Sequence, residues 1–280
     1  LRAAFEGFHQ TVRGVLAGSQ LPRLETQMLL QHVLRVPRSW LIAHDTDPLD
    51  PQAVARFQGL AGRRLRGEPM AYLVGQREFM GHEFKVGPGV LIPRPETELL
   101  VETALRHLDK PGLDAPRVLD LGTGSGAVAI SIALACPRAQ VVATDVSVQA
   151  LAVAADNARN LGAEVEFLCG NWYEPIAGQP RFDVIVSNPP YIAASDPHLG
   201  QGDLRFEPRG ALTDGGDGLG ALEIITRGAT SRLRPGGVLW MEHGWDQAPA
   251  VRSLLQSTGF RQVGSSSDLA GIERITGGSL

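Results

Sequence analysis

The chain has 280 residues, of which 43% are hydrophobic and 20% are charged, and its formal net charge is −4. This composition is typical of an ordinary globular protein that forms one large or two modest domains. The slightly acidic balance argues against a protein that grips nucleic acid mainly through phosphates. All the basic residues except Lys85 and Lys110 are arginine, which we attribute to genome composition.

Compartment and metal content follow from what the sequence lacks. No apolar run has the length of a signal peptide or a membrane span, so we expect a cytoplasmic location. The first residue is Leu1, which suggests that the start of the chain has been trimmed or is not included. Cys136 and Cys169 have no zinc-site spacing, and both fall in predicted core elements. We therefore expect free, buried thiols in a reducing compartment and no metal.

The first 70 residues predict helices. Helical spacing after Pro22 is shared by Leu24, Gln27, Met28, Gln31 and Leu34, and residues 52–66 predict another helix. The histidines there, His9, His32 and His44, are isolated, so surface or core positions are the default interpretation. Arg63, Arg64 and Arg66 form a charge cluster, for which a solvated helix face is favoured over an RNA contact.

The pattern then changes to strands. Residues 78–80 and 83–86 predict a hairpin around Gly81 and His82. From Pro95 onward helices and strands alternate, which favours a mostly parallel sheet with helices on both faces. Residues 236–242 predict a central strand. Residues 260–263 and 272–275 predict a closing hairpin.

A glycine-rich turn joins a strand to a helix. Strand 117–121 leads into Gly122, Thr123, Gly124, Ser125 and Gly126, and then into helix 127–135. Glycines there allow positive φ and close approach of a ligand to the backbone. The spacing is G-x-G-x-G rather than the dinucleotide pattern G-x-G-x-x-G. The turn is thus a candidate ligand site, and the alternative is a tight turn with no ligand.

Two further residues follow neighbouring strands. Asp145 ends strand 140–145, 23 positions after Gly122, where a carboxylate typically bonds the hydroxyls of a ribose. The alternative is a helix N-cap, but Ser147 is available for that role, which frees Asp145. Trp172 follows strand 164–168, and it either stacks on a purine in the same crevice or simply covers the end of the sheet.

The most informative stretch is the NPPY loop, made of Asn188, Pro189, Pro190 and Tyr191. It follows the apolar strand 182–187, at the strand end where open α/β sheets bind ligands. The prolines stiffen the loop and remove two N–H donors. The Asn188 side-chain oxygen and the Pro189 carbonyl can accept hydrogens from one planar amino group, and Tyr191 offers a flat face. The alternative is a Pro-Pro turn that only closes a strand.

Together, the glycine turn, the acid after the second strand and the NPPY loop after the fourth resemble the class I S-adenosylmethionine-dependent methyltransferases. Three further stretches, residues 89–98 (GVLIPRPETE), 206–208 with 215–218, and 241–244, narrow the resemblance to the release-factor glutamine methyltransferase family. It covers nearly the whole chain. Ser125 and Met241 are conservative departures from the family pattern.

The resemblance implies an α/β fold, with a Rossmann-like methyltransferase domain at residues 94–280. Its sheet is expected to be mostly parallel and seven-stranded, with a closing antiparallel hairpin. A helical substrate-docking domain (1–72) and a β-hairpin linker (73–93) are expected before it. The implied reaction methylates the side-chain amide of the glutamine in the Gly-Gly-Gln motif of class I peptide chain release factors. No membrane partner and no direct nucleic-acid substrate are expected.

The resemblance also implies site residues. S-adenosylmethionine is expected to bind to Gly122, Thr123, Gly124, Ser125, Gly126, Asp145 and Trp172, with Asn188 near its methionine end. Asn188, Pro189 and Tyr191 are expected to be catalytic, and the whole NPPY loop, including Pro190, to bind the glutamine. A carboxamide nitrogen is a poor nucleophile, and positive charge grows on it as the methyl arrives. Two carbonyl acceptors would stabilise that charge.

Three other functions stay open. The same loop chemistry serves DNA adenine or RNA guanine methyltransferases, which usually have a basic cleft. Another protein methyltransferase, such as one acting on a ribosomal-protein glutamine, is the second. The third is a non-enzymatic binding protein, against which the intact glycine turn, Asp145 and the NPPY loop argue. The sequence does not establish the roles of Glu96, Glu207 and Glu242. Acids beside prolines or at strand ends can brace loops rather than contact the substrate.

Overall fold

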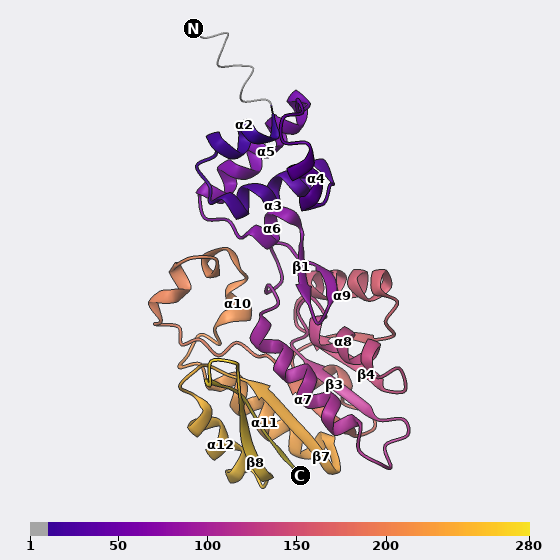
Figure 1. Cartoon of the computed structure of the whole chain (residues 1–280). Coiled ribbons are helices and arrows are strands. Elements are labelled where there is room, and N and C mark those ends of the chain that lie inside the picture. The colour runs from indigo at the N-terminus through magenta and orange to yellow at the C-terminus, as the bar shows by residue number, and fades with distance from the viewer. Residues whose placement is uncertain (1–10) are drawn as a thin grey trace. The chain divides into compact units, whose positions relative to one another are not determined.

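A computed structural model describes residues 11–280, and the chain divides into two compact units between Gly75 and Gln76 (Figure 1). Our predictions for residues 1–10, including His9, lie outside the described residues. The expected division into three parts, 1–72, 73–93 and 94–280, stays a prediction.

The described residues of the first unit are helical. The elements are α2 (Val12–Gly18), α3 (Arg23–Leu34), α4 (Arg38–Ala43), α5 (Pro51–Leu65) and α6 (Met70–Val74). Two of them begin at side-chain caps: Thr11 accepts a hydrogen bond from the Gly14 N–H, and Asp50 accepts one from the Gln52 N–H. Such caps satisfy backbone donors that have no partner in the first turn.

Helix α3 begins directly after Pro22, as predicted, but of the residues that predicted it only Gln27 is buried. Leu24 and Met28 are 60% and 38% exposed, whereas Leu29 and Leu30 are fully buried in the core of this unit. Thr26 lies three and four residues before this buried pair, so the buried face also has helical spacing, and periodicity identified the helix without deciding which stripe faces the core.

The second unit opens with the predicted hairpin. It consists of β1 (Gln76–Phe79) and β2 (His82–Lys85), which pair antiparallel. The connecting residues Met80 and Gly81 both have positive φ, 51° and 77°, as in the tight turns that match strand twist. Phe79 and Phe84 meet edge to face with ring centroids 6.0 Å apart, and both are buried in the core of this unit.

A seven-stranded sheet forms the centre of the second unit. Its strands are β3 (Arg117–Leu121), β4 (Gln140–Asp145), β5 (Glu166–Cys169), β6 (Phe182–Ser187), β7 (Leu233–Glu242), β8 (Arg261–Ser267) and β9 (Glu273–Ser279). The spatial order is β5-β4-β3-β6-β7-β9-β8 (Figure 1). The first five strands are parallel, and β9 pairs antiparallel with β7 and β8. The predicted fold class, including the closing hairpin, is confirmed.

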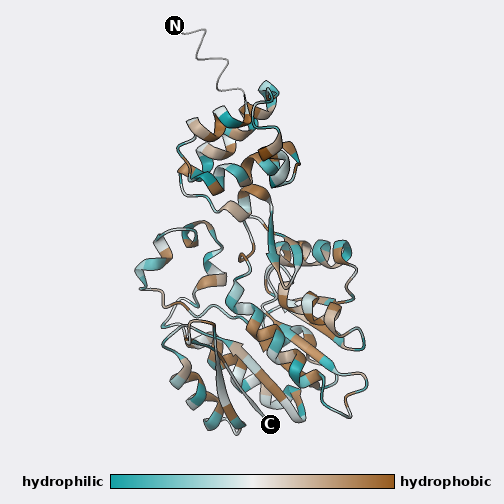
Figure 2. Ribbon diagram, in the orientation of Figure 1, coloured by the Kyte–Doolittle hydropathy of each residue, from teal (hydrophilic) through white to brown (hydrophobic). Residues whose placement is uncertain are grey.

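Helices cover both faces of this sheet. They are α7 (Glu98–Leu108), α8 (Ala127–Ala135), α9 (Val148–Leu161), α11 (Gly220–Arg232) and α12 (Ala248–Ser257). Successive strand residues face opposite sides, so Val118 packs with α7 and α8 while Leu119 packs with α11 and α12. Figure 2 shows hydrophobic colouring along the strands and on α8.

Short elements complete the second unit. They are the 3-10 turns η2 (Pro95–Thr97), η3 (Glu174–Ile176), η4 (Pro197–Gly200) and η5 (Leu204–Phe206), and the helix α10 (Arg209–Leu212). Among residues 11–280, no helix combines the length and the apolar character needed to cross a membrane.

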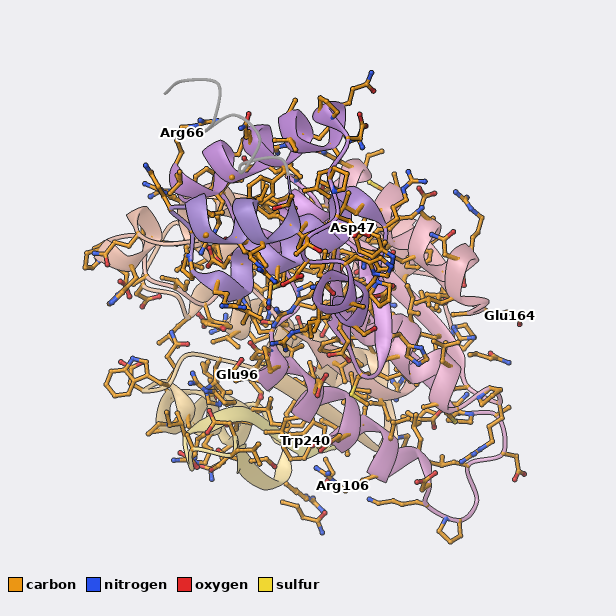
Figure 3. All side chains as sticks on the ribbon, turned by 45° about the horizontal axis from the view of Figure 1, so that its top comes forward. Asp47, Arg66, Glu96, Arg106, Glu164 and Trp240 are labelled. Atoms are coloured by element: carbon orange, nitrogen blue, oxygen red, sulfur yellow. The ribbon has the colours of Figure 1, made fainter. Side chains whose placement is uncertain are left out.

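The edge strand β5 departs from the prediction in two ways. It begins at Glu166, and Glu164 lies before it as an exposed side chain (Figure 3). Cys169 ends this strand and is exposed, so the expectation of two buried thiols is wrong for Cys169 and right for Cys136. The reason is position, because β5 has a neighbouring strand on one side only.

Candidate active site

The candidate site lies where neighbouring parallel strands end together. The register aligns Leu121 with Thr144 on β4 and with Ser187 on β6, and Ser187 with Met241 on β7. The residues that come next in the chain therefore lie side by side: Asp145, Gly122, Asn188 and Glu242. Adjacent strands are about 5 Å apart, so these four positions span one short edge of the sheet.

The glycine turn has the backbone that its sequence predicts. Gly122, Gly124 and Gly126 all have positive φ, at 73°, 57° and 82°. At Gly126 a Cβ atom would lie 2.7 Å from Cδ1 of Ile130 and 3.1 Å from Cβ of Ala154, so this glycine lets the start of α8 pack closely against α9. At Gly124 a Cβ atom would meet nothing within 4 Å, so the turn is open to a ligand there.

Asp145 holds this turn. Its Oδ2 accepts a hydrogen bond from the Gly124 N–H at 2.9 Å, and its Oδ1 accepts one from the Ser147 N–H at 2.8 Å. The Ser147 hydroxyl caps α9 by accepting from the Ala150 N–H, as predicted. The expectation that Asp145 is thereby freed needs correction, because both oxygens hold backbone donors. Each oxygen keeps a further lone pair for ligand hydroxyls.

Trp172 lies against the same turn. Its Cζ3 is 3.6 Å from the position of a Cβ atom at Gly122. The residue has a left-handed φ of 45°, and its carbonyl accepts a hydrogen bond from the Thr144 hydroxyl at 3.1 Å. This bond holds the backbone of Trp172, and the edge of its ring lies beside Gly122.

Two residues that were not predicted from the sequence, Asp120 and Asn157, also hold the glycine turn in place. Asp120 is buried and accepts a hydrogen bond from the Thr123 hydroxyl at 2.7 Å. Burial raises the pKa of this carboxyl to about 7, opposed by the bond from Thr123. Asn157 donates to the carbonyls of Ser125 and Lys85 and accepts from the Lys85 N–H, so it ties the turn to the β1–β2 hairpin.

Side chains from three segments meet at the NPPY loop. The Asn188 Nδ2 donates to Thr97 Oγ1 at 3.1 Å, and the Thr97 hydroxyl donates to Glu242 Oε2 at 2.6 Å. The Tyr191 hydroxyl donates to Glu242 Oε1 at 3.0 Å. Burial raises the pKa of Glu242 above its ordinary value, although the hydrogen bonds from Thr97 and Tyr191 oppose this shift. Burial also raises the pKa of Tyr191.

The backbone of the NPPY loop is held from the opposite side. Gln247 Nε2 donates to the Tyr191 carbonyl at 3.0 Å, and its Oε1 accepts from the Gly244 N–H at 2.8 Å. The Asp214 carboxylate accepts hydrogen bonds from the backbone N–H groups of Gly218 and Gly220. These bonds hold the loop of residues 214–220, in which Gly218 lies against the Tyr191 carbonyl.

The comparisons with known proteins agree with this geometry. The family model described as the Methyltransferase small domain matches residues 95–218, and the PrmC N-terminal domain model matches residues 11–75. A release factor glutamine methyltransferase from Bordetella pertussis is 64% identical, over 96% of this chain and 99% of its own length. Relatives of the same name from Burkholderia pseudomallei and Neisseria gonorrhoeae are 54% and 50% identical, over 96% and 92% of this chain and 96% and 93% of theirs. The chain belongs to the release factor glutamine methyltransferase family.

Solved structures add evidence on the fold alone. The chain is similar to the 16S rRNA N2 G1207 methyltransferase of T. thermophilus, with a TM-score of 0.54 and 22% identity over 73% of this chain and 49% of that one. It is also similar to a Pyrococcus furiosus methyltransferase, with a TM-score of 0.52 and 18% identity over 79% and 98% of the two chains. The fold is that of the class I S-adenosylmethionine-dependent methyltransferases.

Besides Glu242, the sequence left two acids of this family member without a role, Glu96 and Glu207, and these two acids lie in different places. Glu207 is buried and accepts hydrogen bonds from the Ile92 N–H and from Arg94, with which it forms an ion pair. It therefore braces the segment that leads into η2. Glu96 lies within η2 and is only partly buried (Figure 3), and its charge raises the pKa of Glu242.

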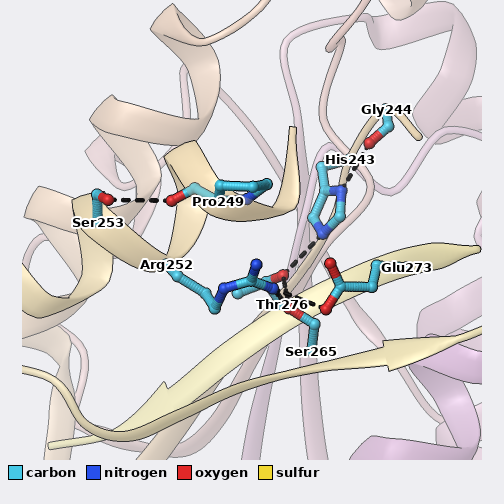
Figure 4. Close-up of polar contacts among 8 residues, drawn as sticks. All are labelled: His243, Gly244, Pro249, Arg252, Ser253, Ser265, Glu273 and Thr276. Atoms are coloured by element: carbon cyan, nitrogen blue, oxygen red, sulfur yellow. Dashed lines mark hydrogen bonds and ion pairs between the residues drawn. The ribbon is translucent and has the colours of Figure 1, made fainter. Parts of the chain in front are cut away.

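His243 anchors the strand end that carries Glu242 in this methyltransferase (Figure 4). Its Nδ1 is 2.9 Å from the Gly244 carbonyl and its Nε2 is 2.7 Å from the Thr276 hydroxyl. Burial lowers the pKa of the ring. The neutral ring therefore donates from Nδ1, since a carbonyl only accepts, and its Nε2 accepts from Thr276. The contacts continue from Thr276 through Ser265 to Arg252 and Glu273.

Proposed function

We propose that this enzyme transfers a methyl group from S-adenosylmethionine to the side-chain amide of the glutamine in the Gly-Gly-Gln motif of class I release factors. The observation that carries the proposal is that Gly122 and Asn188 lie side by side at the ends of neighbouring strands. Each of them directly follows a residue that is paired with one on the other strand. A cofactor site and an amide-binding loop on adjacent strands suit a direct transfer between their two ligands. Family membership supports the substrate class.

The residues at the glycine turn fit the cofactor. The open space at Gly124 admits a ligand against the backbone, and the half-buried ring of Trp172 offers a stacking face. Asp145 retains lone pairs for ribose hydroxyls beside this turn. When bound, S-adenosylmethionine supplies an electrophilic methyl group on a sulfonium sulfur.

The NPPY loop supplies the other half of the chemistry. Asn188 Oδ1 and the Pro189 carbonyl would accept the two hydrogens of the glutamine NH2, and Tyr191 would lie along the plane of the amide. These contacts fix the direction in which the nitrogen lone pair points. They also stabilise the positive charge that develops on nitrogen, because both acceptors are preorganised carbonyl dipoles. No strong base is required, since the proton can leave after the transfer.

The helical unit is proposed to dock the release factor. Its surface has a hollow of about 850 Å³, lined by basic and apolar residues that include Arg35, Arg56, Val33 and Leu60. The match of residues 11–75 to a family-specific domain model supports a family-specific task for this unit. Replacing Arg56 by alanine is then expected to raise the KM for the release factor and leave cofactor affinity unchanged.

The decisive experiment is transfer of labelled methyl from S-adenosylmethionine to a purified class I release factor. One sample carries the intact Gly-Gly-Gln motif and the other carries alanine in place of its glutamine, with DNA and total RNA in parallel. Label on the intact factor only is the expected result. Label on nucleic acid, with none on either factor, would assign base methylation instead.

A further inference from the structure

We infer that Glu242 and Thr97 are positioning residues that set the direction of the Asn188 side-chain amide, so that its oxygen rather than its nitrogen faces the substrate. The inference rests on the proposed function and deepens it. Neither Glu242 nor Thr97 is assigned to contact the substrate. They act through Asn188, which does.

The direction of the hydrogen bonds starts at Glu242. In its ionised form, which the hydrogen bonds from Thr97 and Tyr191 favour against the effect of burial, Glu242 only accepts hydrogen bonds, so both hydroxyls that contact it donate. Thr97 donates to Oε2 and Tyr191 donates to Oε1. The hydroxyl hydrogens of both residues are therefore committed to Glu242.

The next step fixes Asn188. Because the single hydrogen of the Thr97 hydroxyl points at Glu242, the Thr97 oxygen can offer only a lone pair to Asn188. The asparagine must then turn its NH2 group toward Thr97, as the 3.1 Å contact from Nδ2 shows. A flipped amide would place two oxygens against each other with no hydrogen between them. The Asn188 oxygen is left to accept from the substrate.

Burial makes this arrangement costly to break. Glu242 is 2% exposed and Thr97 is 4% exposed, so water has little access to replace either partner. An unsatisfied buried donor or acceptor costs about 1–3 kcal/mol. The sequence separation of the Thr97–Glu242 pair is 145 residues, so this contact also joins the segment before α7 to the end of β7.

The test compares replacements of Thr97 that keep or remove its hydroxyl. Thr97→Val keeps the shape and removes the hydroxyl, and we expect kcat to fall about 5- to 150-fold, the factor that about 1–3 kcal/mol gives at about 1.4 kcal/mol for each tenfold. The Kd for S-adenosylmethionine should stay close to that of the wild type, whereas the Tm should fall by a few degrees, because the buried partners of the lost hydroxyl are left unsatisfied. Thr97→Ser restores the hydroxyl and should recover most of the lost kcat. Thr103→Val, at another buried threonine of the α7 segment, is the matched control and should keep wild-type kcat.

A second variant tests the carboxylate itself. Glu242→Gln keeps the side-chain volume, but its amide can donate as well as accept. The direction of the hydrogen bonds from residue 242 through Thr97 to Asn188 is then no longer fixed. The kcat of Glu242→Gln should fall as in Thr97→Val. The double variant with Asn188→Ala should lose no more kcat than Asn188→Ala alone, because both changes remove the same function, an Asn188 oxygen that faces the substrate.

The outcomes separate the two proposals. Wild-type enzyme that labels the release factor, together with Thr97→Val of unchanged kcat, overturns the positioning role alone. So does a Thr97→Ser variant as inactive as Thr97→Val, or a fully additive Glu242→Gln and Asn188→Ala pair. Wild-type enzyme that labels no release factor overturns the proposed function and this inference with it.

Discussion

The backbone of Gly218 lies directly against the carbonyl group of Tyr191. A Cβ atom at position 218 would be 2.2 Å from the Tyr191 oxygen and 2.9 Å from its carbonyl carbon. The residue also has a φ of 86°, a conformation that side chains rarely adopt. Gly218 is thus required both by its own backbone and by the NPPY loop that it supports.

Replacement of Gly218 by alanine is predicted to displace the NPPY loop and to remove most methyl transfer. The control is Gly215→Ala, because Gly215 has nearly the same φ, 83°, but a Cβ atom there would meet nothing within 4 Å. Gly215→Ala should lose about 1–2 kcal/mol of stability to backbone strain, and Gly218→Ala should lose more, because its Cβ atom also displaces the NPPY loop. Only Gly218→Ala should also lower kcat by tenfold or more. Equal kcat losses in the two variants would show that strain, and not the contact with Tyr191, decides activity.

Asn188→Ala is predicted to remove most turnover while cofactor binding weakens less. The variant loses one preorganised acceptor for the substrate amide, which typically costs about 3–4 kcal/mol at the transition state. The fall in kcat is measured by methyl transfer to the release factor, and the Kd for S-adenosylmethionine is measured by calorimetry. Equal losses in kcat and in cofactor affinity would contradict the role that we propose for Asn188.

The sequence was sufficient to predict the sheet and its turn because the local signals were strong. Strand 117–121, helix 127–135 and strand 182–187 agree with β3, α8 and β6, since each is a short apolar run ended by glycine, proline or polar residues. The parallel order of these strands then places their carboxyl ends together. This rule alone predicts that Gly122, Asp145 and Asn188 lie at the same edge of the sheet.

Side-chain contacts between distant segments were beyond the reach of the sequence. Thr97 meets Glu242 only because η2 and the end of β7 are packed together, and no periodicity encodes such a pair. Asn157 lies in an alanine-rich helix, and nothing in that pattern predicts its bonds to Ser125. Cys169 was misplaced because an apolar run predicts a strand without predicting whether that strand lies at the edge of the sheet.

Asp145→Asn is predicted to weaken S-adenosylmethionine binding by about tenfold to a hundredfold, because hydrogen bonds to a charged group are worth about 1.5–3 kcal/mol. The loss arises both at the proposed ribose contacts and at the Gly124 N–H that Asp145 holds. The measurement is calorimetric titration with the cofactor. The matched control is Asp156→Asn, on an exposed ion pair of α9, which should bind the cofactor like the wild type. Unchanged affinity in Asp145→Asn would remove this residue from the cofactor site.

Asp120 predicts a pH dependence of stability whose sign follows from its raised pKa. The folded carboxyl has a pKa of about 7 against an ordinary value of 3.8, so the folded state binds more protons between these values. Stability therefore falls as pH rises from about 4 to about 7, and it stays lower above that range. At about 1.4 kcal/mol for each pH unit, the ionised carboxyl costs the fold about 4 kcal/mol at pH 8.

Asp120→Asn removes this titration and keeps an oxygen that can accept from Thr123. The new amide hydrogens add a cost of their own, but that cost does not change with pH. The free energy of unfolding of the variant, minus that of the wild type, is therefore predicted to rise by about 3 kcal/mol between pH 5 and pH 8. Urea unfolding at the two pH values measures this difference. A difference that stays constant would mean that Asp120 titrates near its ordinary value, and that the charge beneath the glycine turn is present throughout this range.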